Sequence, residues 1–170
     1  VICLTNLERA AEALPDVQRM LQLPADKDGR GAMNAHYETL ALAALPELTV
    51  SGGAQRVTVK GADFAYGFDP ATGLLTSIQS KGVELLAGPL RPDFWRAPND
   101  NDRGSDMMKR LGIWRDAHRF LTVRSFRNET PARGVVRLVL QADLASVRAR
   151  YDIVYTIYGT GDLVVEASFD

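Results

Sequence analysis

Residues 146–158, SVRARYDIVYTIY, decide the fold class of this chain. Apolar residues occupy every second position, and most of the intervening positions carry arginine, aspartate or threonine. Successive side chains of a strand point to opposite faces, so this alternation predicts a half-buried strand with one solvated face. The predicted buried face consists of Val147, Ala149, Tyr151, Ile153, Tyr155 and Ile157.

Further segments with the same period of two lie on both sides of this strand. They are residues 57–59, 64–68, 74–78, 83–86, 120–126, 135–142 and 163–169. Turn sequences separate them, and the strongest is residues 69–73, DPATG. There Asp69 can accept hydrogen bonds from backbone amides, Pro70 presets its φ, and Gly73 can adopt a positive φ. The pattern predicts an all-β, antiparallel fold.

The first 48 residues have a different pattern. Apolar residues recur at helical spacing over residues 7–14 and 17–23, and Pro15 and Pro24 interrupt them. We therefore divide the chain into residues 1–45, a linker or the tail of a preceding domain, and a β domain at residues 46–170. The chain does not begin with methionine, which we interpret as a sign of a piece of a longer protein. No signal peptide is recognisable, so the predicted location is cytoplasmic or unknown.

Composition excludes several classes of function. The formal net charge is -1, which gives no electrostatic reason to expect binding to nucleic acid or to an anionic membrane. No run approaches the roughly 18 apolar residues of a membrane span. Cys3, His36 and His118 lie far apart in sequence and do not have the spacing of zinc ligands, so no metal or other cofactor is predicted in this chain.

The candidate functional stretch is residues 90–116, LRPDFWRAPNDNDRGSDMMKRLGIWRD. Short polar side chains at residues 99–102 compete for backbone hydrogen bonds, so we expect a loop there. A short helix is predicted to follow at residues 106–113, capped by Ser105, with Met107, Leu111 and Trp114 near one face. The candidate substrate-binding or rim residues are Arg96, Asn99, Asp100, Asn101, Asp102 and Gly104.

The residue types in this stretch allow more than one interpretation. Carboxylates and amides bind sugar hydroxyls, and Trp95 could pack on a sugar ring. A Ca²⁺ loop is disfavoured because the glutamate that ends an EF-hand loop is missing. A purely structural turn, with Arg96 paired to Asp100 or Asp102, remains open. No pair of acids is marked out for glycoside hydrolysis, so catalysis by this chain alone has no support.

Two motifs resemble one enzyme family. Residues 68–76 (FDPATGLLT) and 90–104 (LRPDFWRAPNDNDRG), with Trp114 following, resemble the bacterial multidomain β-galactosidases of glycoside hydrolase family 2 type. They resemble the start of the C-terminal, small-chain region, also called domain 5. The resemblance covers residues 46–170. It implies an antiparallel supersandwich similar to galactose mutarotase, of which this chain holds only the N-terminal part.

The resemblance also implies a role. The parent enzyme would hydrolyse terminal β-D-galactosides such as lactose with retention, using two glutamates on a catalytic TIM barrel that this chain lacks. The chain would be an accessory fragment, inactive alone, whose residues 96–104 face the barrel and whose residues 104–109 form a mobile loop. Mg²⁺ and Na⁺ are implied for the full enzyme only.

Three further expectations follow from the motifs and from the incomplete sandwich. An unfinished sheet exposes unpaired edges, so the predicted partners are the barrel, the other domains of the parent enzyme, and further copies of the fragment. The first alternative function is a stand-alone carbohydrate-binding β-sandwich. The second alternative is a structural interdomain module.

Overall fold

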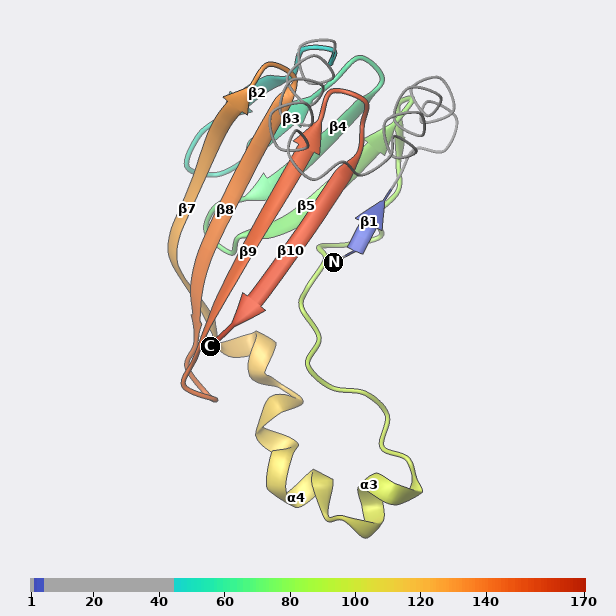
Figure 1. Ribbon diagram of the computed structural model, residues 1–170, viewed down its shortest axis with the longest axis vertical. Coiled ribbons are helices and arrows are strands. Elements are labelled where there is room, and N and C mark those ends of the chain that lie inside the picture. Colours follow the sequence, from blue (N-terminus) through green and yellow to red (C-terminus); the bar gives the residue numbers. More distant parts are fainter. Residues whose placement is uncertain (1, 5–44) are drawn as a thin grey trace, which may run out of the picture.

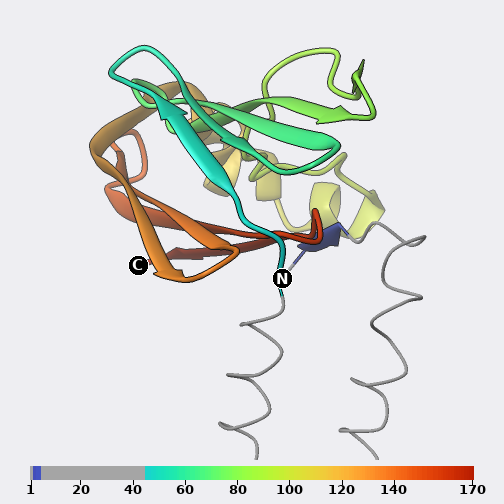
Figure 2. The same ribbon diagram turned by 90° about the horizontal axis from the view of Figure 1, so that it is seen from above.

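The computed structural model describes residues 2–4 and 45–170, and in this part of the chain the strands form two antiparallel sheets that face each other (Figures 1 and 2). Sheet A has the order β1 (Ile2–Leu4), β10 (Leu163–Phe169), β9 (Ala149–Tyr158), β8 (Val135–Leu144) and β7 (Leu121–Ala132). Sheet B has the order β2 (Thr49–Gly52), β3 (Val57–Lys60), β4 (Phe64–Asp69), β5 (Leu74–Ser80) and β6 (Val83–Glu84). The predicted all-β class is confirmed. The helices predicted at residues 7–14 and 17–23 lie outside the described residues.

Each segment with a period of two contributes a strand, but several boundaries differ from the prediction. Strand β9 begins at Ala149 rather than at residue 146, because Arg148 has a φ of 55° in the turn before it. Residue 120 belongs to a 3₁₀ turn, η2 (Ala117–Phe120), and β7 continues beyond residue 126 to Ala132. Strands β1 and β2 were not predicted, and β1 pairs with β10 through residues far away in sequence.

Strand β6 ends two residues earlier than predicted because Glu84 binds the backbone. Its carboxylate accepts hydrogen bonds from the N–H groups of Ile78 (2.9 Å) and Leu86 (3.1 Å) and from the Ser77 hydroxyl (2.5 Å). The Ser77 hydroxyl contributes most, followed by the two amides, and together they lower the pKa of Glu84 to about 2. The ionised Glu84 side chain therefore replaces a strand partner as the hydrogen-bond acceptor for the Ile78 N–H group at this sheet edge.

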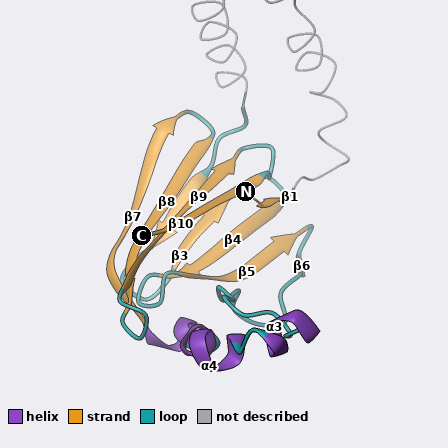
Figure 3. Cartoon of the chain, turned by 60° about the horizontal axis from the view of Figure 1, so that its bottom comes forward, coloured by secondary structure: helices purple, strands orange, loops and turns teal. Residues whose placement is uncertain are grey.

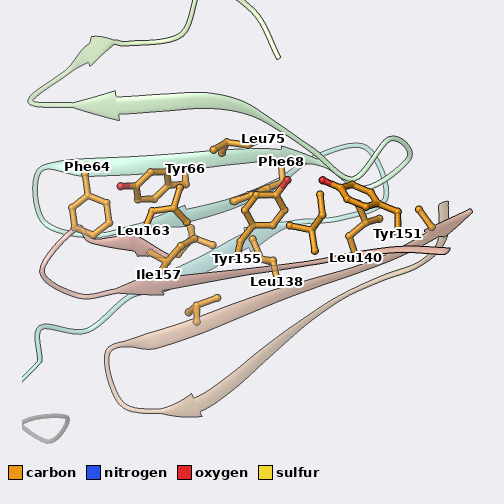
Figure 4. Packing of buried hydrophobic residues seen from close by; sticks show 14 of the residues in the cluster. Phe64, Tyr66, Phe68, Leu75, Leu138, Leu140, Tyr151, Tyr155, Ile157 and Leu163 are labelled. Atoms are coloured by element: carbon orange, nitrogen blue, oxygen red, sulfur yellow. The ribbon is translucent and has the colours of Figure 1, made fainter. Parts of the chain in front are cut away.

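The core lies between the two sheets (Figure 4). Phe64, Tyr66 and Phe68 of β4 share one face, as predicted, and all three are buried. Phe68 packs on Tyr155 of β9 with ring centroids 5.0 Å apart and a tilt of 60°. The Tyr66 hydroxyl donates to the Gly161 carbonyl (2.7 Å), and burial raises the pKa of Tyr66 to about 12. Sheet B is thus fixed to the β9–β10 turn of sheet A.

The predicted inner face of β9 is also confirmed. Its buried members include Tyr151, Ile153, Tyr155 and Ile157. The opposite face was predicted to be solvated, but Thr156 on that face is buried. The alternation of side chains therefore identified the face of β9 that enters the core, but it did not show that part of the opposite face is also buried.

The DPATG turn joins β4 to β5 and packs against sheet A. Asp69 accepts hydrogen bonds from the Ala71 N–H (2.9 Å) and from the Thr72 hydroxyl (2.8 Å), while its carbonyl accepts the Gly73 N–H (2.7 Å). Gly73 has a φ of 68°, and a Cβ atom at this position would lie 2.4 Å from Cδ1 of the buried Leu140. Both the backbone conformation and the lack of space therefore require glycine here.

We predict that Gly73→Ala lowers the free energy of unfolding by about 1–3 kcal/mol, because a left-handed backbone and an overpacked core both disfavour alanine. Chemical denaturation followed by far-UV circular dichroism measures this loss. Gly88→Ala is the matched control, since no atom lies within 4 Å of the added Cβ and no positive φ occurs there. The control is expected to stay within about 0.5 kcal/mol of the original chain. Equal losses in the two variants would contradict this explanation of the turn.

Candidate functional site

The stretch singled out from the sequence forms a helical arm, defined here as residues 94–114, at one end of the sandwich (Figures 1 and 3). It contains α3 (Asp100–Gly104), α4 (Met107–Leu111) and a 3₁₀ turn, η1 (Gly112–Trp114). None of the residues in these three elements is buried. The helices of the arm are therefore not part of the sandwich core.

Aromatic contacts fix both ends of the arm to sheet A. Phe94 at the start of the arm packs edge-on against Tyr151 of β9, with centroids 5.3 Å apart and an interplanar angle of 85°. Trp114 at the end of the arm lies 6.0 Å from Phe94 and 5.9 Å from Phe169 of β10. Each such pair adds about 0.5–1.5 kcal/mol beyond the burial of area. The arm is thus a loop closed by aromatic packing.

The expectation of a loop at residues 99–102 is wrong, because these residues cap and begin α3. The Asn99 side chain accepts a hydrogen bond from the Asp102 N–H (3.0 Å), and the Asp102 carboxylate accepts one from the Asn99 N–H (2.9 Å). This reciprocal arrangement is a capping box, in which two amides without helical partners are satisfied. Short polar side chains are favoured both at a helix start and in loops, because their oxygen atoms accept hydrogen bonds from nearby backbone N–H groups.

The helix predicted at residues 106–113 is also wrong in its boundaries. Ser105 does not cap it; instead its hydroxyl donates to the Asp102 carbonyl at the end of α3 (3.2 Å). The following helix, α4, starts after Asp106, which has a φ of 55°, and Gly112 then begins η1. Of the three apolar residues predicted near one face, Met107 and Trp114 are half-buried, whereas Leu111 is 44% exposed.

Arg96 pairs with Asp102, one of the two partners that the sequence had left open. The two guanidinium nitrogens lie 2.6 and 2.8 Å from the two carboxylate oxygens, which gives a bidentate pair. The hydrogen bonds from Arg96, followed by the one from the Asn99 N–H, hold the pKa of Asp102 below its usual range. A carboxylate held in this ionised form is poorly suited to act as a general acid, and its visible role is to hold the arm together.

The remaining candidate residues face outward. The Asp100 side chain is 99% exposed and has a long contact of 3.3 Å to Arg103. Asn101 and Gly104 are exposed, and a Cβ atom added at Gly104 would meet open space. The structure therefore divides the predicted set into a clasp made by Arg96, Asn99 and Asp102, and a free surface made by the other three.

Trp95, the predicted sugar-stacking residue, is half-buried. Its backbone N–H donates to the Asp93 carboxylate (3.0 Å), and among the described residues its ring takes no part in the aromatic contacts of Phe94. The two neighbouring aromatic residues therefore differ: Phe94 anchors the arm, and Trp95 remains partly open to solvent.

The sequence did not predict that several large apolar side chains on and beside the arm stay exposed. Large side chains that are 44–62% exposed lie on α4, in the two 3₁₀ turns and at the end of β10, namely Met108, Leu111, Ile113, Phe120 and Phe169. The signal was present in the sequence as apolar residues within a segment too short to bury all of them. Exposed apolar side chains that form one patch are typical of contacts with another domain or protein.

Two other possibilities can be assessed for residues 2–4 and 45–170. In this part of the chain, no three histidine, cysteine or acidic side chains are grouped as metal ligands. No described helix has the length and apolar character needed to cross a membrane.

The two antiparallel sheets and the arm define an all-β sandwich domain with a helical excursion. The chain belongs to the β-galactosidase small-chain family, since the family described as "Beta galactosidase small chain" matches residues 60–170. This finding confirms the resemblance noted in the two sequence motifs.

Individual relatives agree with the family. A β-galactosidase of Priestia megaterium is 36% identical over 129 residues, which cover 74% of this chain and 12% of the relative. A β-galactosidase of Halalkalibacterium halodurans is 28% identical over 153 residues, covering 90% of this chain and 14% of the relative. A "Beta-galactosidase small subunit" of Latilactobacillus sakei is 38% identical over 78 residues, covering 46% and 24% of the two chains. The chain thus spans less than a quarter of the length of each of these relatives.

We predict that Asp102→Asn loosens the arm while Asp100→Asn leaves it unchanged, because only Asp102 belongs to the clasp. Exchange of the backbone amides of Arg103 and Ser105, which donate to the Asn99 and Asn101 carbonyls, should become about tenfold faster in Asp102→Asn. Hydrogen exchange followed by NMR measures this change. The same exchange rates in both variants would show that the clasp does not hold the helix.

Proposed function

We propose that this chain is part of the accessory domain of a β-galactosidase that hydrolyses terminal β-D-galactosides with retention, and that its arm forms part of the active-site rim. Family membership and the names of the relatives support the enzyme class. The catalytic glutamates, and the Mg²⁺ and Na⁺ implied by the resemblance, would belong to the rest of the enzyme. The chain alone is then inactive toward galactosides.

The observation that carries the proposal is the exposure of the arm. A short helical segment without a buried face is not stabilised by its own propensity, because isolated helices need about 12–15 residues even for favourable sequences. Here, capping and aromatic packing hold the arm in a fixed place while Met108, Leu111 and Ile113 stay 44–56% exposed. We infer that a neighbouring domain covers these side chains. In its absence, the same surface favours self-association of the fragment.

The polar part of the arm gives the proposed rim its chemistry. Asp100 and Asn101 present a carboxylate and an amide next to each other at the first turn of α3. Such groups accept and donate hydrogen bonds to hydroxyls of a sugar or to polar groups of a neighbouring domain. The clasp of Arg96, Asn99 and Asp102 holds the helix in place. The side chains of Asp100 and Asn101 are therefore available for contacts outside the domain.

We predict that Asn101→Ala in the parent enzyme lowers kcat/KM for a chromogenic β-galactoside about tenfold and leaves Tm unchanged, since Asn101 contributes little to folding and one lost polar contact is worth about this factor. Steady-state kinetics and a thermal scan measure both effects. Asn128→Ala, at an exposed position of β7, is the matched control and should leave kcat/KM as it was. Unchanged kinetics in Asn101→Ala and Asp100→Ala alike would refute a role in the rim.

A further inference from the structure

A cavity of about 210 Å³ lies where three segments of the chain meet, outside the arm. The DPATG turn and the start of β5 contribute one wall, the loop after β6 contributes the second, and η2 with the start of β7 contributes the third. The lining residues are Ala71, Thr72, Leu74, Arg91, Pro92, His118, Arg119 and Leu121. Ala71, Thr72, Leu74, Arg91 and Pro92 belong to the two motifs that resemble the β-galactosidases, and no role was assigned to them there beyond the turn.

The charged residues that line the cavity are both basic. Arg91 is exposed and makes no ion pair or hydrogen bond with the described residues. Arg119 lies 3.2 Å from Asp116, but the same carboxylate is also 3.4 Å from Arg115. Asp116 therefore contacts Arg119 and Arg115 together, and Arg91 is the lining charge that has no ion pair among the described residues.

Asp69 of the adjoining turn does not line the cavity. Its two carboxylate oxygens accept hydrogen bonds from Ala71 and Thr72 inside the turn, so its negative charge stays next to the cavity without lining it. Nδ1 of His118 is enclosed and has no hydrogen-bond partner in the described part of the chain. Because this atom is enclosed, it does not itself face the open cavity, and the His118 ring forms part of the cavity wall.

We propose that this cavity binds a small oxyanion through Arg91 and Arg119, with the His118 ring as part of its wall. The guanidinium group presents several donors in a plane that matches the oxygens of a phosphate or carboxylate. Pro92, Leu74 and Leu121 give the cavity apolar walls that weaken the competition of water. A water molecule occupies about 30 Å³ of liquid, so the volume admits a phosphate-sized anion together with some water.

The test is a titration of the ¹⁵N-labelled chain with inorganic phosphate and, separately, with sodium acetate, against sodium chloride at equal ionic strength. Saturable shifts are expected at the backbone amides of Ala71, Thr72, Arg91 and Arg119 with at least one of the two oxyanions. Saturation by phosphate identifies a tetrahedral anion, and saturation by acetate alone identifies a carboxylate. Arg91→Gln should weaken binding about tenfold, which is the expected loss of one charge-assisted contact.

Matched variants make the result decisive. Arg137→Gln removes the same charge at an exposed position of β8 and should bind the anion like the original chain. Arg119→Gln gives a second test of the cavity in case Arg91→Gln perturbs folding, which the amide signals of Leu138 and Tyr155 in the core report. Shifts that chloride reproduces, or an affinity equal in all three variants, would overturn the proposal.

Discussion

The packing of Phe94 against the end of sheet A sets the position of the whole arm relative to the sandwich. Its ring lies 5.3 Å from Tyr151, 6.0 Å from Trp114 and 6.4 Å from Phe169, so one side chain joins both ends of the arm to β9 and β10. These strands also carry the core, where Tyr155 packs on Phe68 of the opposite sheet. The position of the arm is therefore set by the same strands that stabilise the sandwich.

Because its ends are fixed, the arm needs little stabilisation of its own. The capping box between Asn99 and Asp102 and the bidentate contact with Arg96 satisfy its polar groups locally. The helix α3 forms without burial of any of its residues. Its outward side chains, such as Asp100 and Asn101, can therefore contact another domain or a ligand. A segment whose polar groups are satisfied locally, and which carries exposed apolar residues, suits a surface that meets another domain without first having to fold.

The sequence predicted the features that depend on neighbouring residues and missed those that depend on distant ones. Alternation identified the buried face of β9, and the DPATG turn followed from the properties of Asp69 and Gly73. The run at residues 99–102 was mistaken for a loop, because Asn and Asp favour both loops and helix starts and only the pairing of Asn99 with Asp102 distinguishes the two. Likewise, no local pattern shows that Arg91 and Arg119 come together at one cavity, since the contact depends on the fold of both sheets.

The claim on which the functional account rests is that a neighbouring domain of a β-galactosidase covers the arm. Hydrogen–deuterium exchange of residues 100–111, compared between the chain alone and the parent enzyme, tests this most directly. The amide of Arg110, which donates to the Asp106 carbonyl in α4, is a suitable reporter. The account predicts markedly slower exchange of this segment in the parent enzyme, with the core amides unchanged. Equal exchange in the two proteins would show that the arm stays open to solvent and would contradict the account.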